Sequence, residues 1–153
     1  MKHHHDNQDG FNEALEQILE LSVLLTEDMA GELGRLGLTR SRAHVVWLVH
    51  QRGPMTQRAL ADAIGVSARN VTGLVDGLTE TGFVSRQPHP SDRRATLVTL
   101  TEHGAATADD LAAQQVVLAR ALFAELPDRE FDQLSSGLDH VVTALRTLIA
   151  EAS

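Results

Sequence analysis

Residues 54–104 read PMTQRALADAIGVSARNVTGLVDGLTETGFVSRQPHPSDRRATLVTLTEHG, and this stretch decides the fold. Its first half holds two short segments with apolar residues at helical spacing, joined by the tight turn Gly65-Val66. Thr56 and Ser67 stand where helix N-caps belong, directly before each segment. Two short helices joined by a few residues that include glycine are typical of a helix-turn-helix.

The hydrophobic period changes after Gly82. Residues 83–86 and 95–100 predict two strands, and the second is rich in β-branched residues. Residues 87–94 contain two prolines, a serine and an aspartate, which predict a turn-rich loop between them. A hairpin directly behind a helix-turn-helix predicts a mainly α winged helix-turn-helix, with a three-helix core and a β-hairpin wing.

Apolar helices are expected on both sides of this region. Residues 11–36 repeat apolar side chains at helical spacing until three glycines interrupt the pattern, and Thr39 can cap a next helix that stops at Gly53-Pro54. Residues 101–153 predict a long helix capped by Thr101 and a last helix that begins at Pro127. The terminal helices are too apolar for isolated surface helices, which favours a dimerisation role.

Composition excludes several classes of protein. The chain has 153 residues and no cysteine, which excludes disulfides, thiolate metal sites and cysteine nucleophiles. No apolar run is long enough to cross a membrane, and residues 1–10 are polar, so a soluble cytoplasmic protein is expected. Residues 1–10 are expected to be disordered or tag-like, and His3–His5 are either native or added. Neither the eight histidines nor the serines show a metal-ligand or catalytic spacing, so no metal, cofactor or enzymatic activity is expected.

The net charge of −8 is unevenly distributed. Residues 35–94 contain nine arginines against four carboxylates, a net charge of +5, and the rest of the chain carries −13. A basic middle between acidic flanks is typical of a nucleic-acid-binding module on a separate scaffold. Chance clustering on a solvated surface is the alternative interpretation of the charge alone.

The motifs within residues 54–104 resemble those of the MarR family, the multiple-antibiotic-resistance-type regulators. The matching segments are Met55-Thr56-Gln57, Leu60-Ala61, Val66-Ser67, Val71–Asp76, Leu78, Gly82-Phe83-Val84, Pro90–Arg94 and Leu100–Gly104. The ordered set that ends in Asp92-x-Arg94 and Leu-Thr-Glu-x-Gly is the specific part. The flanking helices also follow the family's order, so the likeness covers nearly the whole chain past residue 11.

The resemblance implies one MarR-like domain over residues 11–153. Residues 11–36 and 101–153 would form the dimerisation helices, and residues 39–100 the winged-helix DNA-binding region. It implies a homodimeric, sequence-specific transcriptional regulator. Its expected form is a repressor that is released by a small ligand, for which an aromatic molecule is the candidate. Two-fold symmetry predicts a pseudo-palindromic double-stranded operator with half-sites one helical turn apart.

The second short helix, residues 67–81, is the candidate recognition helix. Arginine pairs with guanine and asparagine with adenine, so Arg69, Asn70 and Thr72 are expected at base edges. Gly73 stands where relatives often carry a longer side chain, so either one base contact is missing or the helix sits closer to DNA. The full set of expected DNA-binding residues is Thr56, Gln57, Arg58, Ser67, Arg69, Asn70, Thr72, Gly73, Arg86, Asp92, Arg93 and Arg94.

Several of these residues have a second interpretation. Ser67 either caps its helix or touches a phosphate, and capping is favoured. By resemblance Arg94 enters the minor groove while Asp92 holds it or the wing loop, and the alternative is that these residues only stabilise the hairpin. Trp47 and His44 either line an effector cleft or pack structurally, and structural packing is favoured for Trp47. A winged helix used only for protein interaction is the alternative function, and a neutral or acidic recognition face would indicate it.

Overall fold

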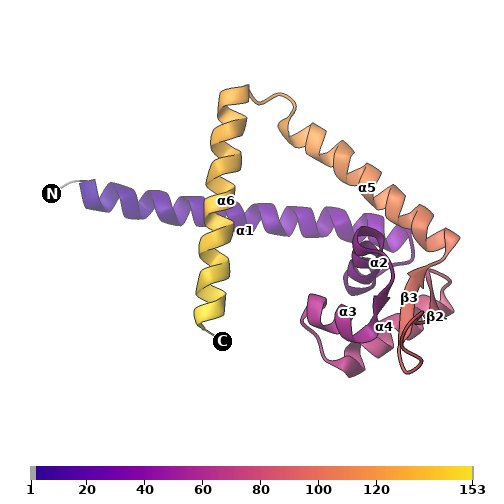
Figure 1. Ribbon diagram of the computed structural model, residues 1–153. Helices are drawn as coiled ribbons and strands as arrows, with labels where there is room; N and C mark the ends of the chain where they lie inside the picture. Colours follow the sequence, from indigo (N-terminus) through magenta and orange to yellow (C-terminus); the bar gives the residue numbers. More distant parts are fainter. Residues whose placement is uncertain (1–2, 153) are drawn as a thin grey trace. The chain divides into compact units, whose positions relative to one another are not determined.

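The computed structural model describes residues 3–152, which form six helices and a three-stranded sheet (Figure 1). The elements are α1 (His3–Arg35), α2 (Arg40–Arg52), β1 (Met55–Thr56), α3 (Gln57–Ile64), α4 (Ala68–Glu80), β2 (Val84–Pro88), β3 (Thr96–Leu100), α5 (Glu102–Phe123) and α6 (Asp128–Glu151). The chain divides into two compact units, Met1–Asp109 and Asp110–Ser153. The expected single domain over residues 11–153 therefore stays a prediction. Within residues 3–152, no helix has the length and apolar character needed to span a membrane.

The first unit contains the predicted winged helix. Thr39, Thr56 and Ser67 cap α2, α3 and α4, and each side-chain oxygen accepts a backbone N–H three residues later. The three helices and the sheet meet around a core of fully buried aliphatic side chains: Val45, Val46, Leu60, Val71, Val75, Leu78, Val84 and Val98. This confirms the three-helix core and its hairpin.

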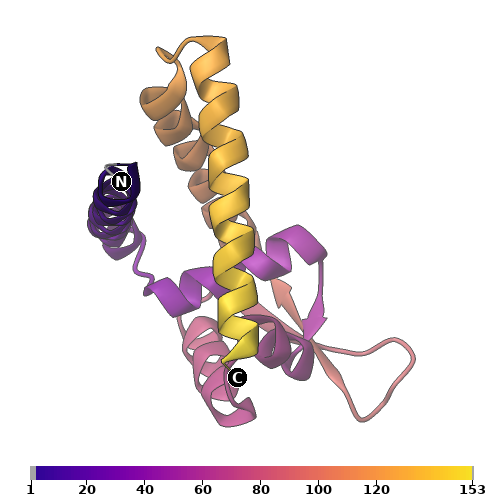
Figure 2. The same ribbon diagram turned by 90° about the vertical axis from the view of Figure 1, so that its left-hand side faces the viewer.

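The wing is a three-stranded antiparallel sheet in the order β1-β3-β2, one strand more than the sequence predicts. Met55 pairs with Val98 and Val84 pairs with Leu100, so β3 is the central strand. The two-residue β1 has no periodicity that a sequence pattern can reveal, because it exists only through its pairing with β3. Figure 2 shows the β2–β3 loop reaching away from the rest of this unit.

The α1 helix differs from its prediction at its start and at two of its glycines. It begins at His3, not at Phe11, so residues 3–10 continue the helix where disorder or a tag was expected. Adding a residue to an existing helix requires no new nucleation, and this segment contains no proline. Gly31 and Gly34 lie inside α1 without breaking it, and the chain turns only at Gly37, whose φ is +73°.

The junction between the wing and α5 is built from the Leu-Thr-Glu-x-Gly motif. The Thr101 hydroxyl donates to the carbonyl oxygen of Gly82 at 2.5 Å and accepts the backbone N–H of Gly104 at 3.0 Å, which caps α5 as predicted. The Thr101 backbone N–H donates to the Phe83 carbonyl at 3.1 Å. A Cβ on Gly104 would overlap that same carbonyl, so the first turn of α5 approaches the wing through a residue that has no side chain.

The second unit exposes the apolar side of α6. No residue of this 24-residue helix is buried. Its exposed apolar side chains recur every three or four residues along one stripe: Phe131, Leu134, Leu138, Val141, Leu145 and Leu148. At the turn that precedes α6, the Phe123 and Phe131 rings meet edge to face at 5.7 Å. A regular exposed stripe of this kind is typical of a helix that packs against a partner surface.

Replacing Gly104 with alanine should destabilise the protein by about 3 kcal/mol, because the added methyl group meets backbone that cannot rotate away. Gly137→Ala on α6 is the matched control. Nothing lies within 4 Å of its added Cβ, and the change should stabilise the helix by about 0.5–1 kcal/mol. Chemical denaturation followed by circular dichroism measures both. An unchanged unfolding midpoint for Gly104→Ala would contradict the close approach.

Candidate nucleic-acid interface

The N-terminal half of α4 presents the side chains expected at base edges. Arg69 and Asn70 are exposed, in the first turn after the cap. The Ser67 hydroxyl accepts the backbone N–H of Asn70 at 3.2 Å, which confirms its capping role. The other N–H groups of the first turn of α4 carry the partial positive charge of the helix dipole. Such a helix N-terminus favours the binding of an anion.

Gly73 lies one turn further along the exposed side of α4. Nothing lies within 4 Å of a Cβ built there, so no contact within the chain requires a glycine. Gly77 differs, because a Cβ there would meet the guanidinium group of Arg42 from α2. The absence of a side chain at Gly77 therefore leaves room for Arg42. Gly73 is exposed, and its missing side chain leaves a small depression on the surface of α4.

Three of the expected DNA contacts bind one another. Gln57 at the start of α3 donates from Nε2 to the Thr72 hydroxyl of α4 at 3.0 Å. The Thr72 hydroxyl also donates to the Ala68 carbonyl at 2.9 Å. Arg86 on β2 donates from Nε to the Gln57 side-chain oxygen at 3.1 Å and from Nη2 to Asp76 at 2.5 Å. Their expected role at DNA stays a prediction, but the structure already gives each side chain a partner.

The β2–β3 loop is held by the side chains of His89 and Asp92. Nδ1 of His89 accepts the backbone N–H groups of Ser91 and Asp92, both at 3.1 Å. The Asp92 carboxylate accepts the backbone N–H of Arg94 at 3.0 Å. The expected link between Asp92 and the wing is therefore made to the loop backbone. This bond fixes the position of the Arg94 backbone and does not involve the Arg94 guanidinium group.

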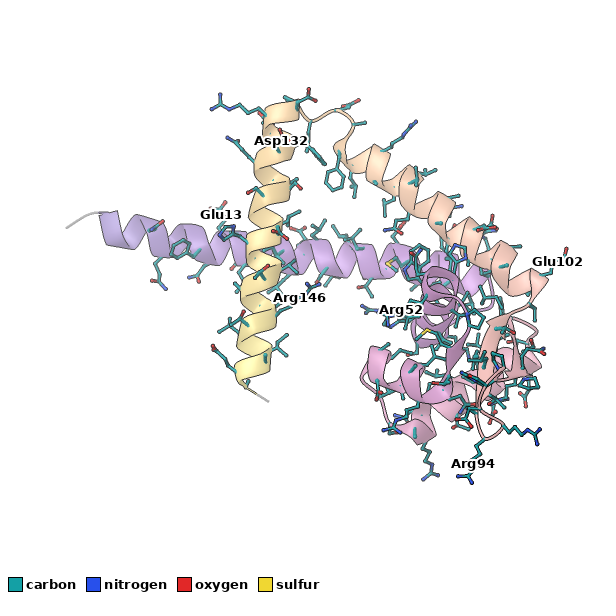
Figure 3. All side chains as sticks on the ribbon, viewed as in Figure 1. Glu13, Arg52, Arg94, Glu102, Asp132 and Arg146 are labelled. Carbon is teal, nitrogen blue, oxygen red and sulfur yellow. The ribbon has the colours of Figure 1, made fainter. Side chains whose placement is uncertain are left out.

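The arginines expected at DNA divide into two groups by exposure. Arg58, Arg69, Arg93 and Arg94 are exposed, and Figure 3 shows the Arg94 side chain projecting from the outer end of the loop. Arg86 differs from them, because only 31% of its side chain is accessible. Thr56 is half-buried as the cap of α3, beside the exposed Arg58. The exposed arginines on α3, α4 and the wing are the groups free to approach phosphate or base edges.

The residues expected to bind an effector lie on α2. His44 is exposed and Trp47 is half-buried, with the His50 ring 5.9 Å from the Trp47 ring. His50 Nε2 lies 3.7 Å from a carboxylate oxygen of Asp109 on α5. Two shallow hollows, on α6 and at the α5–α6 turn, are lined by other residues. The effector site stays a prediction, and among the described residues no cluster of histidine and acidic side chains could hold a metal ion.

The sequence places Asp76 off the core face of the second short helix and His89 on the wing, but sequence reasoning missed the contacts that both residues make. Asp76 pairs with an arginine ten positions away, and His89 organises the wing loop. The opposite charges of Asp76 and Arg86 do not by themselves predict an ion pair, because the contact depends on how β2 packs beside α4. His89 is flanked by prolines in a turn-rich segment, which was the only available indication of a structural role.

The MarR family model matches residues 38–96, which span the winged helix from the end of the α1–α2 turn to the start of β3. Over these residues the chain is similar to the MarR family. This is a family of transcriptional regulators, not of enzymes. The helix-turn-helix and the wing loop described above lie within the matched residues.

Individual relatives agree with this assignment. Over 88 residues the chain is 32% identical to the HTH-type transcriptional regulator YfiV of Bacillus subtilis, a match that covers 56% of this chain and 55% of YfiV. The chain thus spans about half the length of that relative. The crystal structure of YusO from Bacillus subtilis has a TM-score of 0.73 and 19% identity, covering 94% of this chain and 99% of YusO. A MepR–DNA complex from Staphylococcus aureus has a TM-score of 0.67 and 19% identity, covering 85% and 96%. At these identities the two structures share the fold.

Replacing His89 with alanine should loosen the wing loop, because two backbone N–H groups lose their acceptor. A hydrogen bond contributes about 1 kcal/mol, so the amides of Ser91 and Asp92 should exchange about fivefold faster with solvent. His89→Asn is the matched control, because an asparagine oxygen can accept from the N–H two residues later. Amide exchange followed by NMR distinguishes them, and equal exchange rates in the wild type and the alanine variant would disprove the role of His89.

Proposed function

We propose that this protein is a sequence-specific DNA-binding regulator that acts as a homodimeric repressor. The observation that carries the proposal is the grouping of exposed Arg69 and Asn70 on α4 with exposed Arg93 and Arg94 on the wing, all within the first unit. A helix end and a β-hairpin that project from one core are suited to a major groove and the adjacent minor groove. A protein-interaction module would not require cations at both elements.

The proposed dimer is supported by the exposed apolar surfaces of the terminal helices. Phe11, Leu15 and Leu24 on α1 are each more than half exposed, as are Leu145 and Leu148 on α6. These residues lie outside the winged helix, and a second copy of the chain is the partner that would cover them symmetrically. Two recognition helices related by a two-fold axis would then meet half-sites about 34 Å apart along the operator.

Repression follows if the operator overlaps a promoter, because a bound dimer excludes polymerase. We propose that a small aromatic ligand releases the protein by binding beside Trp47 and His44 on α2. Such a ligand acts only if it prefers the conformation that cannot bind DNA. The half-buried indole next to the His50 ring offers a flat apolar surface with polar groups at its edge.

Replacing Arg94 with alanine should abolish operator binding and leave the dimer intact. The operator is first obtained by selecting and sequencing protein-bound DNA. Losing one minor-groove arginine from each protomer should cost about 2–6 kcal/mol, from about 1–3 kcal/mol per contact. If the two exposed arginines of each protomer that are not assigned to bases, Arg58 and Arg93, neutralise phosphate, the wild type should lose affinity with a log–log salt slope of about −4.

The matched control is Arg129→Ala, which removes an exposed arginine of α6 and the same charge. It should bind the operator like the wild type, and gel filtration should give one size for all three proteins. Unchanged gel-shift affinity for Arg94→Ala would overturn the wing assignment. Absence of binding by the wild type at low salt would favour the protein-interaction alternative.

The effector proposal can be followed through Trp47, which is the only tryptophan of the chain. Benzoate, as a simple aromatic acid, should quench its fluorescence at millimolar concentration and weaken operator binding over the same range. His44→Ala should shift both curves to higher benzoate concentration by the same factor, because binding and release are linked. Quenching without release would limit the site to binding alone.

A further inference from the structure

Arg86 joins three elements of the winged helix. Its side chain extends from β2 and reaches the Gln57 side chain of α3 and the Asp76 carboxylate of α4 in the same conformation. Gln57 in turn donates to Thr72, one turn before Asp76 on α4. These contacts form one network that bonds to α4 at two residues, Asp76 and Thr72. Arg86 connects both of them to strand β2 of the wing.

This arrangement differs from that of a phosphate contact. Two of the donor nitrogens of Arg86 point to groups within the protein, and 31% of its side chain is accessible. The planar guanidinium group can serve two acceptors at once in a fixed geometry, which a lysine ammonium cannot reproduce. A DNA contact by Arg86 would first have to break bonds that hold α4.

Asp76 provides the independent observation. It is an acidic residue on the candidate recognition helix, with 56% of its side chain exposed. Charge alone would make it unfavourable beside DNA, so removing it should tighten binding. Its value to a DNA-binding helix must then lie in its ion pair with Arg86.

We propose that Arg86 is a positioning residue that sets the angle of α4 relative to the wing. The fixed angle lets Arg69 and Asn70 meet their bases while Arg94 reaches the neighbouring groove. Gln57 and Thr72 act in the same network, and their side chains serve orientation before any contact with DNA. This inference rests on the proposed DNA binding and specifies which residues make that binding selective.

The experiment compares Arg86→Lys and Asp76→Asn with the wild type on two DNA fragments, the selected operator and a random sequence of equal length. Arg86→Lys keeps the charge and loses the two-acceptor geometry. We expect it to weaken operator binding at least about tenfold, the size of one well-made specific contact, with random-sequence affinity and the salt slope unchanged. Asp76→Asn should also weaken operator binding about tenfold, although it removes a negative charge.

The double variant tests whether the two residues act together. Its operator affinity should fall no further than that of either single variant, because one broken pair already frees α4. Arg129→Lys is the matched control, since Arg129 is an exposed arginine of α6, outside the winged helix, that keeps its charge in the same exchange and should bind within about twofold of the wild type. Circular dichroism melting verifies that every variant is folded at the assay temperature.

Three results would overturn the proposal: wild-type operator affinity in Arg86→Lys, tighter operator binding by Asp76→Asn, or losses that multiply in the double variant. A salt slope reduced by about 0.9 for each arginine removed in Arg86→Ala would instead identify a phosphate contact.

A measurement without DNA separates this inference from the proposed function. In NMR spectra of the free protein, Arg86→Lys should shift the amide signals of α4 residues 68–76 and leave those of α6 in place. Unshifted α4 signals would reject the positioning role whatever the wild type binds.

Discussion

The close contact between Gly104 and the Phe83 carbonyl is the constraint on which the rest of the first unit depends. It joins the end of the recognition-helix segment to the first turn of α5, and Thr101 closes the same junction with bonds to both sides. The wing sheet begins at this point, since Val84 pairs with Leu100 directly beside it. A side chain at residue 104 would separate α5 from the wing and disturb the frame that carries β2, β3 and α4.

The polar residues of the winged helix fall into two groups with different roles. Some orient the binding elements: Ser67 caps α4, His89 shapes the wing loop, and Arg86 links α4 to the sheet. Others remain exposed, notably Arg69 and Arg94. Orientation is achieved with bonds inside the protein, so the backbone that carries the exposed groups is already ordered before a partner binds, and only their side chains lose conformational freedom.

The uneven charge of the chain corresponds to this division. The net charge of −8 averages a basic winged helix with acidic terminal helices. Cations gather where a polyanion is proposed to bind, while the carboxylates of α1, α5 and α6 oppose indiscriminate attraction to nucleic acid. The apolar stripe on α6 belongs to the same acidic part, where a second chain is the proposed partner.

The sequence by itself determined the local elements, because caps, glycine turns and hydrophobic period act over a few residues. Thr56, Ser67 and Thr101 marked helix starts correctly, and the β-branched run at residues 96–100 marked the central strand. Only the tertiary structure decided the pairing of β1 with β3 and the link from Arg86 to Asp76 and Gln57. Those contacts join residues 10 to 43 positions apart, and no short-range pattern records which side chains packing will bring together. For that reason Arg58 and Arg86 looked alike in the sequence, while the fold exposes the first and engages the second.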